Sequence, residues 1–150
     1  MLAFACAIFT SAFLIFQVQP IIARFILPWF GGSPAVWTTC MLFFQIGLLT
    51  GYAYAHLLAT RITLSKQPYI HMGLLIASMM VLPIAPDQTI MTSFDHPPTM
   101  QVLILLLSSV GLPFIILSAS SPLIQHWFAN ANPGVSPFRL YALSNFGSLI

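Results

Sequence analysis

Long apolar segments that carry almost no charge dominate this sequence. The first run, MLAFACAIFTSAFLIF, fills residues 1–16, and three more segments of similar character follow it. A soluble domain carries about 25% charged residues, whereas only 4% are charged here and 59% are hydrophobic. So few polar groups could not cover the surface of a soluble globule of this size. The sequence therefore predicts an all-α, polytopic transmembrane helical bundle.

The lengths of the apolar segments set the expected number of membrane spans. A helix needs about 20 apolar residues to cross a hydrocarbon core of about 30 Å. We expect four full spans plus a truncated fifth, whose roughly 20 Å is too short to cross. A helix that stops inside hydrocarbon leaves its last carbonyls without partners, so we expect the chain to be a fragment of a longer protein. The expected helices are at about residues 2–23, 35–58, 69–85, 100–118 and 138–150.

Turn-forming residues separate the expected spans. GGSP at residues 31–34 predicts a tight connection between the first two helices. The third connection carries both acids of the chain, Asp87 and Asp95. In the fourth connection, Pro122 is expected to start a short interfacial helix that ends near Asn130. Pro113 predicts a kink within the fourth span.

The few basic residues predict an orientation in the membrane. Arg61, Lys66 and Arg139 fall on the side that the N-terminus shares with the second and fourth connections, and Arg24 falls on the other side. Lysine and arginine accumulate on the cytoplasmic side of membrane proteins. We therefore expect a multi-pass protein of the cell (inner) membrane with a cytoplasmic N-terminus.

Small residues recur every four positions along the second span. Gly47, Gly51 and Ala55 share one helical face, and such a face lets a neighbouring backbone approach closely. Two interpretations remain open for this face. It forms a close helix pair within the chain, or it forms a dimer interface.

Polar side chains interrupt the first two spans. Folding these spans into a hairpin about GGSP brings Gln45 level with Gln17 and Gln19. Amides paired across the helices would hold the spans together, and the same groups are also candidates for a substrate or ion pathway. Arg24 fits an interfacial anchor, although an arginine near the membrane is also a functional candidate. The candidate polar membrane site is Gln17, Gln19, Arg24 and Gln45.

Other features of the sequence argue against several functional classes. Cys6 and Cys40 fit small buried hydrophobes, and no two histidines have the i, i+4 spacing of metal ligands. His56 and His71 fit hydrogen bonding at the membrane interface. The chain has no glutamate, no glycine-rich nucleotide loop and no basic stripe. We expect no enzyme activity, cofactor, metal or nucleic-acid partner for this chain; its partners would be the lipid bilayer and other membrane helices.

Three blocks of the sequence together resemble one known family. The blocks are FQVQPIIARFILPWFGGSPAVWTTCMLFFQIGLLTGYAYAHLL, SSVGLPFIILSASSPLIQHWF and FRLYALSNFGSLI. They resemble the N-terminal membrane region of spermidine synthase-like membrane proteins, described as fused MFS/spermidine synthase proteins, where MFS denotes the major facilitator type of transporter. The residues that match the family motif are Gln17, Gln19, Pro20, Arg24, Pro28, Gly31, Gly32, Ser33, Pro34 and Trp37.

The resemblance implies a membrane part that precedes a cytoplasmic domain similar to aminopropyltransferases. In such a domain, a methyltransferase-like Rossmann fold binds decarboxylated S-adenosylmethionine and a polyamine. The present chain lacks the glycine-rich acidic loop of that fold, so no catalytic residue carries over. The resemblance thus implies a membrane domain that anchors or accompanies a catalytic domain absent from this chain.

Two alternative functions remain at the level of sequence. The chain could be part of a small-solute, MFS-like transporter, with Arg24, Gln17 and Gln45 lining a polar cavity. It could also be a small accessory subunit that packs against a larger membrane complex through the face of Gly47, Gly51 and Ala55.

Overall fold

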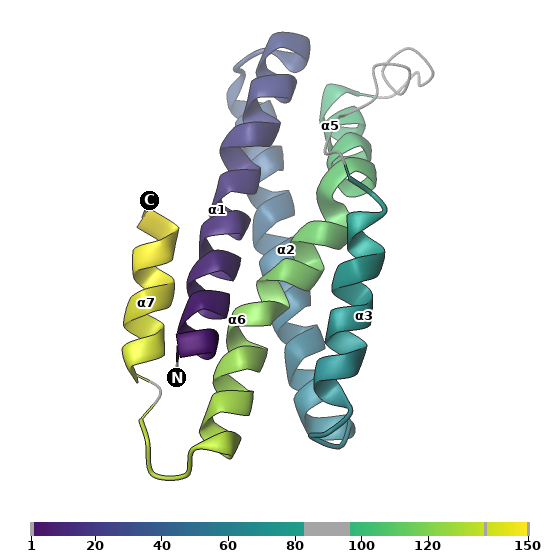
Figure 1. The fold of residues 1–150 in the computed structure, drawn as a ribbon. Coiled ribbons are helices and arrows are strands. Elements are labelled where there is room, and N and C mark those ends of the chain that lie inside the picture. Colours follow the sequence, from purple (N-terminus) through teal and green to yellow (C-terminus); the bar gives the residue numbers. More distant parts are fainter. Residues whose placement is uncertain (1, 83–96, 137, 150) are drawn as a thin grey trace.

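The computed structural model describes residues 2–82, 97–136 and 138–149, and this part of the chain folds into helices without a strand (Figure 1). The all-α prediction is confirmed for these residues. Asp87 and Asp95 lie outside the described residues. The elements are α1 (Leu2–Phe30), α2 (Pro34–Arg61), α3 (Gln67–Met79), α5 (Pro98–Leu106), the π-helical turn η1 (Leu107–Gly111), α6 (Leu112–Ala131) and α7 (Phe138–Leu149).

Three helical stretches are long and apolar enough to span a membrane: Leu2–Phe30, Pro34–Arg61 and Pro98–Ala131. They support a membrane-spanning chain, but four full spans and a truncated fifth are not confirmed. α3 covers only 13 residues, and residues 83–85 of the expected third span lie outside the described part. α7 covers Phe138–Leu149, close to the segment expected at 138–150.

The fourth expected span continues further than the sequence indicates. The expected end at residue 118 and the separate interfacial helix after Pro122 are wrong, because α6 runs through Pro122 to Ala131. Proline removes one backbone hydrogen bond from a helix. Here Leu123 and Phe128 are buried beyond it, and the burial of this apolar surface offsets the cost of the lost bond. Near Pro113, where a kink is expected, α-helical geometry gives way to the π turn η1.

The hairpin between α1 and α2 follows from local turn chemistry. Gly31 has φ +74°, in the left-handed region that favours glycine after a helix end, and its N–H donates to the Leu27 carbonyl at 3.0 Å. The Ser33 hydroxyl caps α2 by accepting from the Val36 N–H at 3.4 Å. Pro34 then occupies the first turn, where its missing N–H costs nothing. The sequence GGSP thus encodes the turn by itself.

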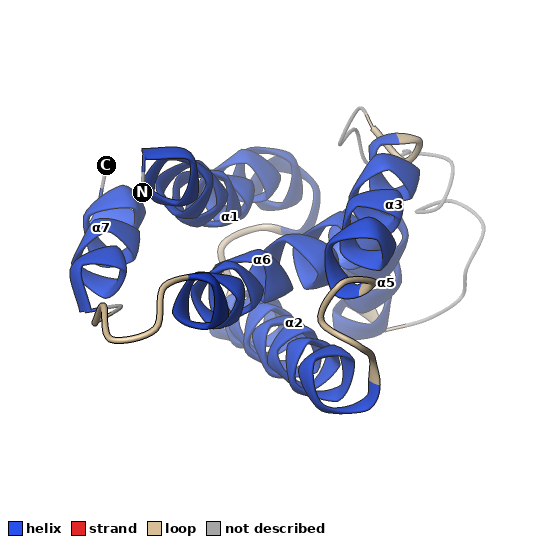
Figure 2. Cartoon of the chain, turned by 60° about the horizontal axis from the view of Figure 1, so that its bottom comes forward, coloured by secondary structure: helices blue, strands red, loops and turns tan. Residues whose placement is uncertain are grey.

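The stretch formed by α5, η1 and α6 is the centre of the bundle. α6 packs against α1, α2 and α3, and α7 packs along α1. Figure 2 shows α6 between α1 and α2, with α3 on the other side of the bundle from α7. α1 and α2 make few contacts with each other although they are joined by a tight turn. The largest core cluster includes Phe44 and Phe114, whose ring centroids lie 5.0 Å apart.

Candidate functional site

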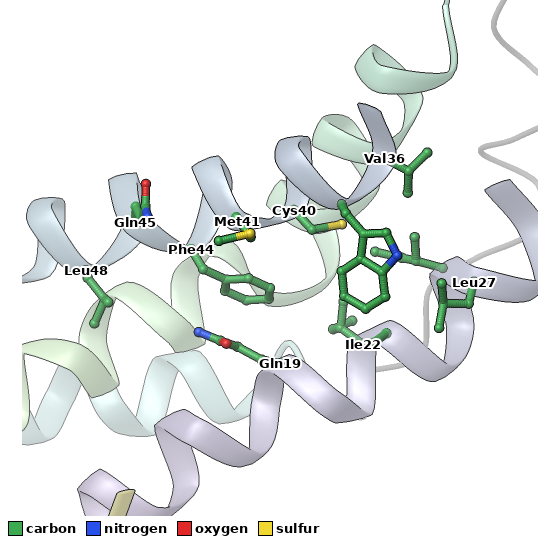
Figure 3. A pocket seen from close by; sticks show the side chains of 12 residues that line it. Gln19, Ile22, Leu27, Val36, Cys40, Met41, Phe44, Gln45 and Leu48 are labelled. Atoms are coloured by element: carbon green, nitrogen blue, oxygen red, sulfur yellow. The ribbon is translucent and has the colours of Figure 1, made fainter. Parts of the chain in front are cut away.

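A groove of about 220 Å³ lies between α1 and α2 (Figure 3). Its lining comes from residues 19–27 of α1 and 36–48 of α2 and is mainly apolar. Ile22 and Val36 are buried in the protein interior, whereas Leu27, Trp37 and Met41 are exposed at its surface. The groove exists because α1 and α2 diverge from their turn to admit the central helix.

Two of the four predicted polar residues, Gln19 and Gln45, line this groove. Each lies 11 residues from the end of its helix at the turn, which is Phe30 for Gln19 and Pro34 for Gln45. At 1.5 Å per residue this is about 16 Å, roughly half the thickness of a hydrocarbon core of about 30 Å. The expectation that they are level with each other agrees with this geometry.

The two amides do not pair across the groove. Within the described residues, neither side chain has a hydrogen-bond partner. Figure 3 shows Gln19 extending from α1 towards α2, while the Gln45 amide points away from α1. The amide pair expected from the hairpin therefore does not form, because the Gln45 side chain is turned away from α1.

The other two members of the predicted polar site lie outside the groove. Arg24 is exposed at the surface of α1, and Gln17 is half-buried; neither lines the groove. The structure therefore brings together two of the four residues. That the four form one functional site stays a prediction.

The small-residue face of α2 packs against α6. A Cβ atom added at Gly47 would lie 2.8 Å from a ring carbon of Phe114, and one added at Gly51 would lie 2.6 Å from the Ile115 carbonyl oxygen. Ala55 is buried in a cluster with Ala119. The face of Gly47, Gly51 and Ala55 thus forms a close helix pair within the chain, which is the first of the two interpretations.

A buried polar cluster that the sequence analysis did not identify joins α3 to α2 and α6. Gln67, which is 1% exposed, donates from Nε2 to the carbonyl of Ile62 at 2.8 Å and to that of Ala59 at 3.4 Å. Its Oε1 accepts from the Trp127 indole N–H at 2.9 Å. One side chain thus binds the end of α2 and the side of α6. The signal available in the sequence was Trp127, because an indole N–H within an apolar helix bundle needs a hydrogen-bond partner.

His71 is the second member of this cluster, and it is 3% exposed. Its Nε2 lies 3.0 Å from the Ser120 hydroxyl and its Nδ1 lies 3.5 Å from the Tyr54 hydroxyl. The imidazole also stacks on the Tyr54 ring and meets the Trp127 ring edge-on. The sequence predicted that His71 forms hydrogen bonds at the membrane interface. In the structure it lies between helices and bonds to side chains of α2 and α6. His56 is exposed.

One tautomer of His71 satisfies every polar atom in this chain of contacts. A neutral imidazole has one donor and one acceptor. If Nε2 carries the proton, it donates to the Ser120 hydroxyl, which in turn donates to the Ile116 carbonyl at 3.4 Å. Nδ1 then accepts from the Tyr54 hydroxyl. With this assignment, each polar atom of the cluster already has a hydrogen-bond partner within the protein. The cluster therefore links the helices and leaves no donor or acceptor for a ligand.

A double-mutant cycle measures the strength of the link between α3 and α6. We expect Ser120→Ala and His71→Leu each to destabilise the protein and to couple by about 0.6–1.7 kcal/mol, the range of hydrogen bonds between membrane helices. Unfolding in mixed detergent–SDS micelles provides the measurement. Ser108→Ala is the control, because Ser108 bonds only to its own helix at Leu105. Additive effects of the Ser120 and His71 substitutions would show that the contact contributes nothing.

Among the described residues, no group of three or more His, Cys, Asp and Glu side chains is arranged to hold a metal ion. Cys6 and Cys40 are free thiols; Cys6 is exposed and Cys40 half-buried, so Cys6 does not have the buried position expected for it. Comparison with protein-family models, curated proteins and solved structures finds no match to this chain.

Proposed function

We propose that the chain is an integral membrane domain of the spermidine synthase-like type, which anchors or accompanies a cytoplasmic aminopropyltransferase-like domain. The main support is that the described buried polar side chains are all used in hydrogen bonds within the bundle, and that Gln67, His71 and Ser120 link α3 to its neighbours. Within the described residues, no buried side-chain nitrogen or oxygen lacks a hydrogen-bond partner. Polar groups of a transport pathway, in contrast, commonly line a water-filled cavity.

The motif that carries the family resemblance also has a structural role here. Gly31, Ser33 and Pro34 build the turn between α1 and α2. Their pattern is thus suited to holding two spans as a fixed hairpin.

The mass of the natural product tests whether a catalytic domain is attached. An epitope tag at the N-terminus, followed by purification from native membranes and intact-mass measurement, should give a product heavier than the tag plus the 16.5 kDa of residues 1–150. The purified product should also transfer aminopropyl groups from decarboxylated S-adenosylmethionine to a polyamine. A product whose mass is only the tag plus 16.5 kDa, and which purifies without such activity, would contradict the proposal.

The location is part of the same proposal: the inner membrane, with the N-terminus in the cytoplasm. The connection between α2 and α3, which carries Lys66, would then face the cytoplasm. Green fluorescent protein inserted there should fluoresce in intact cells, because it does not mature when exported unfolded. An insertion in the turn at Gly32 should remain dark. The reverse pattern would contradict this orientation.

A small-solute transporter is the alternative that one observation favours, namely the unpaired amides of Gln19 and Gln45 in the groove. Uptake into proteoliposomes that is lost on Gln45→Leu and on Arg24→Ala would support it. Uptake unchanged by both substitutions would exclude these residues from the pathway. The accessory-subunit alternative loses its expected surface, since α6 covers the face of Gly47, Gly51 and Ala55.

A further inference from the structure

We propose that the groove between α1 and α2 binds a small, neutral, lipophilic molecule with one ring and a carbonyl or hydroxyl group. This site goes beyond the anchoring role and does not depend on it. It rests on the hydrogen-bonding state of two amides, on the size of the groove and on the character of its walls.

Two amides at the groove have no hydrogen-bond partner in the part of the chain that the structure describes. Gln19 and Gln45 line the groove, and neither has a hydrogen-bond partner within the described residues. They lie about 16 Å from the turn, too deep for a glutamine side chain to reach the headgroups. An amide in hydrocarbon without a partner costs several kcal/mol. A ligand with a carbonyl or hydroxyl group would supply a partner for Gln19, which extends across the groove towards α2, and Gln45 would have to turn towards the ligand to bind it as well.

The size of the groove limits the ligand. A cavity of about 150 Å³ holds a benzene molecule, and drug-sized ligands occupy about 300–1,000 Å³. The groove, at about 220 Å³, lies between these values. It therefore suits one substituted ring, whereas a transmembrane helix about 10 Å across is far too large to enter it.

The lining defines the polarity and orientation of the ligand. None of the residues that line the groove is charged, so a charged ligand would lose its hydration without compensation. Figure 3 shows Gln19 and Gln45 towards one end and Val36 and Leu27 towards the other. The polar group of the ligand would lie at the glutamine end and its ring nearer the turn. Because Leu27 and Met41 are exposed, access is from the lipid.

Two matched probes test the proposal, 4-bromophenol and bromobenzene. They share a ring and a bromine atom that quenches tryptophan fluorescence, and only the phenol can hydrogen-bond strongly. With the protein in lipid nanodiscs, quenching by 4-bromophenol should saturate, and its half-saturation concentration in the bilayer should be about fivefold lower than that of bromobenzene. Trp37 lines the groove, so Trp37→Phe should remove the saturable part of the quenching.

Substitutions at the groove distinguish specific binding from partition into lipid. Gln19→Leu with Gln45→Leu should abolish the preference for the phenol, and Ala23→Phe should fill the groove and abolish saturation by both probes. Gln17→Leu is the matched control, because Gln17 lies two residues from Gln19 and does not line the groove; it should behave as the wild type. Circular dichroism checks that each variant keeps its helices.

Three results would overturn the proposal. The first is quenching of the wild type that rises linearly with probe concentration, as simple partition predicts. The second is equal half-saturation by the two probes, which would remove the role of the amides. The third is saturable quenching that a folded Ala23→Phe or Gln19→Leu/Gln45→Leu variant leaves unchanged, which would place the bound probe elsewhere.

Discussion

Replacing Gly51 with alanine is expected to destabilise the protein by about 2–3 kcal/mol, the upper range for overpacking a close contact. The added methyl group would lie 2.6 Å from the Ile115 carbonyl oxygen and would overlap the Ser118 hydroxyl. A backbone oxygen cannot turn aside as a flexible side chain can. α2 and α6 would have to separate, and α6 is the helix that also holds α1 and α3.

Unfolding in mixed detergent–SDS micelles, followed by circular dichroism, measures this effect. Gly73→Ala is the matched control, because nothing lies within 4 Å of a Cβ atom at Gly73. In a helix interior that change should stabilise the protein by about 0.5–1 kcal/mol, since alanine is better than glycine there. Equal stability of the Gly51 and Gly73 variants would contradict a tight contact between α2 and α6.

Replacing Gln67 with leucine is expected to cost about 2–4 kcal/mol. The change leaves the Trp127 N–H and the Ile62 carbonyl without their partners at 2.9 and 2.8 Å. Each buried polar group left unsatisfied costs about 1–3 kcal/mol. Because Gln67 joins α3 to both α2 and α6, we expect α3 to detach first. Protease sensitivity of the connection before α3 should increase more than that of the turn at Gly32.

The double variant Gln67→Leu/Trp127→Phe separates the lost bond from lost packing. Removing both partners leaves no indole N–H without an acceptor, so the double variant should be more stable than the sum of the single effects indicates. Gln17→Leu is the control for exchanging an amide for an apolar side chain, and it should be close to neutral. An additive double variant would show that the bond between Gln67 and Trp127 does not contribute to stability.

Much of the helical architecture could be predicted because its determinants are local. Residues 31–34 carry a glycine that adopts positive φ, a serine cap and a proline at the first helical turn. The spacing of Gly47, Gly51 and Ala55 also identified a packing face from the helical repeat alone. What the repeat could not identify was the partner, because α6 begins more than 50 residues later in the sequence.

The groove between α1 and α2 and the buried polar cluster differ in how much of each could be predicted from the sequence. Gln19 and Gln45 are at equal distances from one turn, so their common level followed from helix geometry. Their failure to pair depends on the direction of the Gln45 side chain, which points away from α1. The polar cluster links His71 to Ser120 across 49 residues and Gln67 to Trp127 across 60. No local pattern relates residues so far apart.

The sequence by itself determined that this chain is helical and apolar enough for a membrane, and where its first hairpin turns. The helical repeat and the turn residues depend only on residues close together in the sequence, and the composition needs no structure. Each can therefore be recognised in the sequence itself. The tertiary structure alone decided that Pro122 stays within a helix, that α6 occupies the centre, and that the two glutamines at the groove do not pair. These outcomes depend on which helices pack together, and packing is set by the shape and polarity of whole helical faces brought together from distant parts of the chain.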